Sequence, residues 1–211
     1  MDYTAHRSSE FVEVVAALIE FGCYDINEED FSSCTPLSWA ARNGHEEAVN
    51  FLLGQGEINL DKLDKGGRTP LTHAASNGHE GVMKILLGRE EINSDRRDNY
   101  GQTPLSYAAR YGCEGVVKIL LEREEVNANK PDSFGRTPLS CAASQGHEGV
   151  VKILLGREVV NADKPDRRGR TQLSYAASYG HEGAVKILFG REEVDADKLD
   201  KYGQAPLWWA T

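Results

Sequence analysis

The stretch 147–155 alternates apolar and polar residues with the period of an α-helix. Val150, Ile153 and Leu154 stand at positions i, i+3 and i+4, so they line one side of the predicted helix. The stretch 157–169 that follows is rich in Asn, Asp, Pro and Gly, which favour turns. The pattern predicts a short amphipathic helix and an extended loop, and so short a helix cannot bury its apolar stripe alone.

A first helix is predicted directly before this one. The hydroxyl of Thr137 can cap its N-terminus, and Pro138 suits its first turn, where no backbone N–H partner is needed. Gly146 can end the helix in the left-handed conformation. The small side chains of Ala142 and Ala143 would let a neighbouring helix approach closely. The predicted unit is therefore helix, tight turn, helix and extended loop.

The same unit recurs every 34 residues. The triplet Thr-Pro-Leu begins at the first four of the following positions, and one-letter variants of it begin at the last two: Thr35, Thr69, Thr103, Thr137, Thr171 and Ala205. An aspartate recurs with the same period at Asp64, Asp98, Asp132, Asp166 and Asp200. A repeat of this length predicts a solenoid in which each unit is stabilised by the next, and it disfavours a compact multi-layer enzyme domain.

The segment 135–155, GRTPLSCAASQGHEGVVKILL, resembles the ankyrin repeat, whose pattern includes T-P-L-H-x-A. The chain departs from that pattern in its longer loop, in Glu-Glu after the second helix, and in the residue after T-P-L, which here is Ser38, Thr72, Ser106, Ser140 or Ser174. This variant is similar to the arrays of large fungal receptor-like signalling ATPases of the STAND/NLR type. The resemblance implies an all-α solenoid with loop fingers, which binds partners in a concave groove of first helices and loop tips.

The period divides the chain into one continuous domain. We expect residues 1–30 to be a degenerate N-terminal capping repeat, and 200–211 to be a truncated C-terminal repeat. Five full repeats are predicted over 31–199, with approximate boundaries 31–64, 65–98, 99–132, 133–166 and 167–200. The last unit stops midway through a first helix with Trp208 and Trp209, so we expect the chain to come from a longer array or a larger protein.

The copies differ from one another mainly at three places: the second residue after T-P-L, the pair before the helix-ending glycine, and the loop tips. Unselected drift should supply Lys, Glu and Ser more often than the Trp and Tyr found there, and Tyr, Trp and Arg often anchor protein interfaces. The predicted partner-binding residues are Trp39, Arg42, Asn43, Lys65, His73, Asn77, Tyr100, Tyr107, Arg110, Tyr111, Phe134, Cys141, Gln145, Arg167, Arg168, Tyr175, Tyr179 and Tyr202.

Two structural expectations follow for the aromatic residues of this set. The tyrosines of the first helices are expected to be exposed in the groove: Tyr107, Tyr111, Tyr175 and Tyr179. The aromatic residues of the loop tips have an equally good alternative, as structural covers over the next unit: Tyr100, Phe134 and Tyr202.

Composition narrows the possible functions. The 211 residues are 40% hydrophobic and carry a formal charge of −9, so a nucleic-acid partner and an anionic membrane are both disfavoured. No apolar run approaches the length of about 18 residues that a membrane span needs, and the first residues lack a secretory signal. The four cysteines, Cys23, Cys34, Cys113 and Cys141, form no C-x-x-C pair, so we expect reduced thiols in a cytoplasmic protein.

Candidate catalytic and metal-binding residues all belong to repeat columns. The histidine column, His45, His79, His147 and His181, places its members one repeat apart, beyond the reach of one metal ion. Cys113 stands in that column in one unit, so a structural role at the inter-helix turn is favoured. The Asp-Lys-x-Asp loops hold a lysine where a calcium loop needs oxygen ligands, so local Asx turns are expected instead. No phosphate-binding loop or nucleophile elbow is present, so we expect no enzyme activity, no cofactor and no metal.

The sequence therefore predicts a monomeric, non-catalytic protein–protein recognition module within a larger intracellular signalling or scaffold protein. The repeated Glu and Asp residues would stack as acidic ladders, which could select a partner with a basic surface. Two alternatives remain open. The array could regulate an attached enzyme domain by binding it in cis, or it could be an engineered consensus-like repeat protein with no natural partner.

Overall fold

A computed structural model of the chain describes residues 25–56 and 58–210, and within them it contains paired α-helices. The first helices of the pairs, called inner helices below, are α2 (Pro36–Asn43), α4 (Pro70–Asn77), α6 (Pro104–Arg110), α8 (Pro138–Gln145) and α10 (Gln172–Ser178). The second, or outer, helices are α3 (Glu46–Gly54), α5 (Glu80–Leu87), α7 (Glu114–Leu121), α9 (Glu148–Leu155) and α11 (Glu182–Phe189). A short 3₁₀ helix, η1 (Pro206–Ala210), follows. The predicted N-terminal capping repeat lies mostly outside the described residues.

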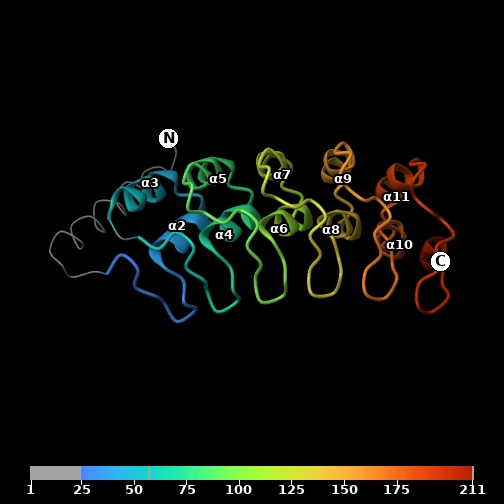
Figure 1. Cartoon of the computed structure of the whole chain (residues 1–211), viewed down its shortest axis with the longest axis horizontal. Helices are drawn as coiled ribbons and strands as arrows, with labels where there is room; N and C mark the ends of the chain where they lie inside the picture. The colour runs from blue at the N-terminus through green and yellow to red at the C-terminus, as the bar shows by residue number, and fades with distance from the viewer. Residues whose placement is uncertain (1–24, 57, 211) are drawn as a thin grey trace.

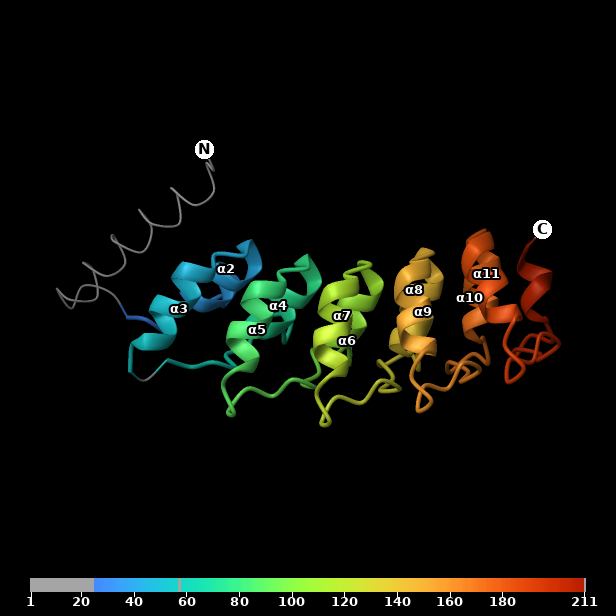
Figure 2. The ribbon, with the colours of Figure 1, turned by 90° about the horizontal axis from the view of Figure 1, so that it is seen from above.

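The helices form two parallel layers (Figures 1 and 2). Each inner helix packs on the next inner helix, each outer helix packs on the next outer helix, and η1 packs on α10. The loops between the pairs project from the edge opposite the outer helices as a row of fingers (Figure 1). The predicted all-α repeat solenoid is confirmed. None of the helices in the described part of the chain is long and apolar enough to span a membrane.

The helix boundaries follow from local chemistry. At α8, the Thr137 side chain accepts a hydrogen bond from the backbone N–H of Ser140, and Pro138 is the first helical residue. Gly146 ends the helix with φ = 70°, in the left-handed region. The hydroxyl of Ser140 lies 3.1 Å from that of Thr137, so the residue that replaces the family's histidine completes the cap. The expected start and end of this helix are confirmed.

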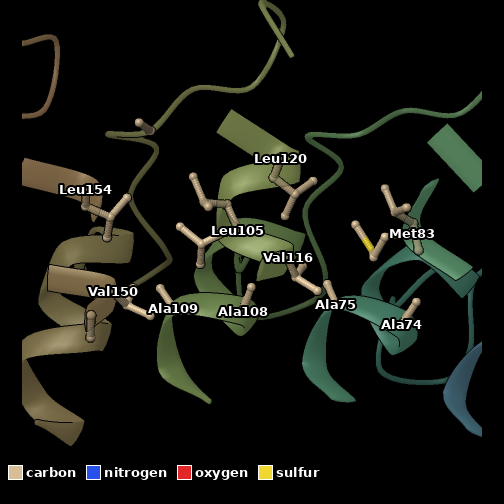
Figure 3. Packing of buried hydrophobic residues seen from close by; sticks show 14 of the residues in the cluster. Ala74, Ala75, Met83, Leu105, Ala108, Ala109, Val116, Leu120, Val150 and Leu154 are labelled. Atoms are coloured by element: carbon tan, nitrogen blue, oxygen red, sulfur yellow. The ribbon is translucent and has the colours of Figure 1, made fainter. Parts of the chain in front are cut away.

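The core lies between the two layers (Figure 3). Leu105 of α6 and Val116 and Leu120 of α7 are fully buried, and so are Ala108 and Ala109 of α6. Burial of one leucine side chain stabilises the folded state by roughly 1.5–3 kcal/mol. Each unit gains this stabilisation mainly from its neighbours, because its own two helices cannot cover their apolar stripes.

Backbone hydrogen bonds hold each finger and join it to the next. Within one finger, the N–H of Asp64 donates to the carbonyl of Arg68 (3.0 Å). Between fingers, the bonds run from Lys65 N to Ser32 O (3.0 Å), Asn99 N to Gly66 O (3.0 Å), Ser133 N to Tyr100 O (2.9 Å), Arg167 N to Phe134 O (3.0 Å) and Lys201 N to Arg168 O (2.9 Å). The fingertips are therefore fixed relative to one another along the whole row.

Candidate functional site: the finger face

The surface formed by the fingertips and the exposed ends of the inner helices is called the finger face below. Most of the predicted partner-binding residues lie on it. Its exposed aromatic residues are Phe31, Trp39, Tyr100, Tyr111, Phe134, Tyr179 and Tyr202. Its exposed polar and charged residues from the predicted set are Arg42, Asn43, Lys65, Asn77, Gln145, Arg167 and Arg168, and Arg110 is half-buried. The array thus presents large side chains on fingers that are hydrogen-bonded to one another.

Four members of the predicted set are buried, so the expectation that Tyr107 and Tyr175 are exposed in the groove is wrong. His73 and Cys141 are each 1% exposed, Tyr175 is 3% exposed and Tyr107 is 9% exposed. These residues lie on the side of the inner helix that faces the finger of the same unit. The buried aspartate of that finger stands nine residues earlier in the chain. The Tyr107 hydroxyl, for example, donates to Asp98 Oδ2 at 2.7 Å. His73, Tyr107 and Tyr175 thus support the fingers through the buried aspartates, and Cys141 is buried at the same position.

The tyrosines at the helix ends and the aromatic residues of the loop tips are exposed. Tyr111 and Tyr179 are 57% and 61% exposed, as expected. Tyr111 stacks on Tyr107, with ring centroids 6.4 Å apart. The exposed ring of Tyr111 thus lies next to the buried ring that is hydrogen-bonded to the finger. The loop-tip residues Tyr100, Phe134 and Tyr202 are more than half exposed, so they do not serve as buried covers.

The recurring aspartate is the centre of each finger. One oxygen of Asp166, Oδ1, accepts from the backbone N–H groups of Arg168 (2.7 Å) and Arg170 (2.9 Å). The other, Oδ2, accepts from the Tyr175 hydroxyl (2.7 Å) and from the Arg170 guanidinium (3.1 Å). Burial is the main cause that raises the pKa of the Tyr175 hydroxyl, and the hydrogen bond to Asp166 adds to it. The expected Asx turns are present, but this aspartate column is buried and forms no acidic ladder on the surface.

The α4 unit replaces the tyrosine of this arrangement with a histidine. His73 Nε2 lies 3.1 Å from Asp64 Oδ2, and the Arg68 guanidinium lies 2.9 Å from the same oxygen. Burial tends to raise the pKa of Asp64, but the hydrogen bonds from the backbone and side chain of Arg68 outweigh it and leave the pKa lowered. Burial, and after it the charge of Arg68, lower the pKa of His73.

These shifts predict a pH dependence that belongs to His73. Because its folded-state pKa lies below the unfolded value of about 6.5, its contribution to stability is present above that pH and is lost as the pH falls below it. We expect the melting temperature of His73→Tyr, which copies the neighbouring unit, to fall less between pH 7.5 and pH 5 than that of the wild type. Asp64 stays ionised in both states over this window, so equal pH slopes in the two proteins would contradict the assignment.

Cys34, Asp64 and His73 bring their ligand atoms within 4.8 Å of one another, closer than any other such group in the described residues. Cys34 stands where later units have Arg or Gln, next to the finger of the α4 unit. Burial raises the pKa of the Cys34 thiol, which disfavours the thiolate that a metal requires. The guanidinium of Arg68 already neutralises Asp64. Asp64 and His73 of this cluster are therefore engaged in hydrogen bonding within the finger.

The histidine column joins neighbouring units at the inter-helix turn. His79 Nε2 lies 3.0 Å from the carbonyl oxygen of Arg42, and His147 Nε2 lies 2.9 Å from that of Arg110. His181 Nε2 lies 3.1 Å from the carbonyl oxygen of Ser144. Each of these three histidines thus binds a carbonyl group at the end of the inner helix of the preceding unit, where helix carbonyls lack intrahelical partners. The predicted structural role is confirmed.

Lysines of the Asp-Lys-x-Asp loops also act between units, and so does Lys130 at the same position of the variant loop 129–132, which begins with Asn129. Lys130 Nζ lies 2.7 Å from Asp95 Oδ2, and Lys198 pairs with Asp163 in the same way. The lysine thus takes the place beside the aspartate that a calcium ion would need.

The exposed fingertip residues Phe31 and Lys201 are absent from the predicted set. Phe31 is 99% exposed. It follows Asp30, which stands one period before Asp64, so the period itself places Phe31 at the tip of the first finger. The predicted set left Phe31 out because only the later copies were compared at the loop tips, and at the last tip it included Tyr202 but not Lys201.

The family model for ankyrin repeats (3 copies) matches the chain three times, over residues 3–64, 56–132 and 124–200. The chain therefore belongs to the ankyrin-repeat family. No curated protein matches it in a sequence comparison. Ankyrin repeats are generally protein–protein interaction modules, and the fold is typically non-catalytic.

Proposed function

We propose that this chain is a non-catalytic recognition module that binds another protein through its finger face. In keeping with the arrays that its repeat variant resembles, we place it within a larger signalling or scaffold protein. The side chains of the finger face would supply the binding energy, and the solenoid would hold them in position.

One observation carries the proposal: large side chains are exposed on fingers that backbone hydrogen bonds join to one another. Tyr111 and Tyr179 project from the ends of inner helices, and the fingertips are joined by backbone hydrogen bonds. Aromatic residues and arginine dominate the energy of protein interfaces, and a support that is ordered before binding lowers the entropic cost of association.

The proposal predicts where binders attach. Binders selected from a displayed random peptide library should protect backbone amides of the fingers and inner helices from hydrogen exchange. Tyr111→Ala with Tyr179→Ala should weaken their binding at least tenfold, because two exposed interface anchors are removed. The melting temperature should change little, since neither ring is part of the core.

Phe189 on α11 provides a matched control, because it is 58% exposed and belongs to the outer layer. Its replacement with alanine should leave binding unchanged. If most binders protect the outer helices, or if Phe189→Ala weakens binding as much as the double variant does, the proposal is wrong.

A further inference from the structure

We infer that the finger face selects an acidic partner segment, an extended peptide rich in Asp and Glu that lies along the fingertips. This inference rests on the proposed function and specifies the chemistry of the partner. It is the reverse of the expectation that acidic ladders would select a basic surface.

The first support is the composition of the fingertip row, defined as residues 31–32, 65–66, 99–100, 133–134, 167–168 and 201–202. These twelve residues include no Asp or Glu. The row contains four cations and four aromatic residues: Lys65, Arg167, Arg168, Lys201, Phe31, Tyr100, Phe134 and Tyr202. All eight side chains are exposed. The row is thus a strip of cationic and apolar contacts without a competing acid.

The second support is the position of the acidic residues. The segments that form each finger and inner helix are 30–43, 64–77, 98–111, 132–145, 166–179 and 200–209. They contain nine Lys and Arg, six Asp and no Glu. Five of the six aspartates are buried inside the fingers, and Asp30 is the one exposed acid within these segments. The remainder of the chain holds 15 basic and 27 acidic residues, so the negative charge of the molecule lies elsewhere.

The third support is the grouping of the free cations. Arg167, Arg168 and Lys201 occupy two adjacent fingertips that are joined by the hydrogen bond from Lys201 N to Arg168 O. Among the described residues, none of these three side chains has an acidic partner within ion-pair distance, whereas Arg136 and Arg170 are bound to the buried Asp132 and Asp166. Three unpaired cations on a fixed support favour a partner that brings carboxylates.

The spacing of the fingers fits an extended peptide. Neighbouring helices pack about 8–10 Å apart, and an extended chain advances about 3.3 Å per residue, so one unit corresponds to about three peptide residues. Lys65 and Arg167 are three units apart, with Tyr100 and Phe134 between them. The matching segment is about 12–15 residues long, with acidic residues towards its ends and apolar residues in the middle.

A nucleic acid is a less suitable ligand for this row. Its backbone carries one phosphate per nucleotide, and affinity grows with the number of phosphates neutralised. The four cations are separated by two fingers that lack charge, Asn99-Tyr100 and Ser133-Phe134, and the whole chain is strongly acidic. Apolar peptide side chains match those two fingers better than phosphates do.

The test uses the full chain and a random 16-residue peptide library displayed on phage. Enriched peptides should be net acidic. When synthesised and labelled, they should bind at least tenfold more weakly to the triple variant Arg167→Glu, Arg168→Glu and Lys201→Glu, and more weakly in 500 mM than in 50 mM NaCl. The control, Lys84→Glu with Lys118→Glu and Lys152→Glu, changes the net charge equally on exposed positions of outer helices and should bind like the wild type.

Each other outcome has a distinct meaning. Enriched peptides that are neutral or basic, or that bind the triple variant as tightly as the wild type, would overturn the inference and leave the proposed function intact. A 16-nucleotide single-stranded DNA that binds the finger face more tightly than the best peptide would overturn the choice of a protein ligand. If no peptide is enriched on the finger face, both the inference and the proposed function fail.

Discussion

Replacing Asp166 with alanine is expected to destabilise the array by about 4 kcal/mol. The substitution removes the acceptor of two backbone N–H groups and of the Tyr175 hydroxyl, and it leaves the Arg170 guanidinium without its acidic partner. Each buried donor left without an acceptor costs about 1–3 kcal/mol. The loss of the carboxylate beside Arg170, whose side chain is 26% exposed, adds a smaller cost. Chemical denaturation of the wild type and the variant measures the difference.

Asp195 is the matched control for this prediction. It also accepts a backbone hydrogen bond, from Asp197 N at 2.9 Å, but it lies in an exposed turn. Its replacement with alanine should cost about 0.5 kcal/mol, since water can satisfy the freed N–H. Similar losses for Asp166→Ala and Asp195→Ala would show that the buried network contributes little.

Replacing Gly146 with alanine is expected to cost about 2–3 kcal/mol. Gly146 has φ = 70°, and the left-handed conformation costs an alanine about 1 kcal/mol. A Cβ atom there would also lie 2.5 Å from Nδ1 of His181, whose ring is held by the hydrogen bond to the carbonyl of Ser144. The ring of the next unit would have to move, and that hydrogen bond, together with the packing of the ring, would be lost.

Gly180 separates the cost of the left-handed backbone conformation from the cost of the steric contact with histidine. It has φ = 69° at the equivalent turn between α10 and α11, and a Cβ atom built there meets no neighbour within 4 Å. Gly180→Ala should therefore cost only the conformational part, about 1 kcal/mol. In a His181→Ala background the cost of Gly146→Ala should fall to the same value, and an unchanged cost would exclude the histidine contact as its cause.

Two groups of side chains hold the finger face in place. The buried aspartates shape the fingers from within, and His79, His147 and His181 connect their units to the preceding ones. Because both devices repeat along the chain, the exposed residues at the fingertips and helix ends keep a fixed spacing. That fixed spacing is the property on which the proposed recognition of an acidic segment depends.

The sequence alone determined the class of the fold. The 34-residue period, the Thr-Pro caps, the helix-ending glycines and the apolar stripes act over a few residues, so their effects can be predicted from neighbouring letters. Thr137, Pro138 and Gly146 act in the structure as predicted. Most of the finger face was also predictable. The repeats differ mainly at positions where packing within the array does not constrain the side chain, as at Tyr111 and Arg167.

Only the tertiary structure decided which side of the inner helix is open. Tyr107 and Tyr111 are one helical turn apart and share a face, yet a finger covers the first and leaves the second exposed. The finger reaches Tyr107 because Asp98 folds its loop back over the helix, and burial depends on that packing rather than on the identity of the residue. The same packing hides the aspartates and aligns the cations of separate units, so the charge of the finger face is a property of the assembled array.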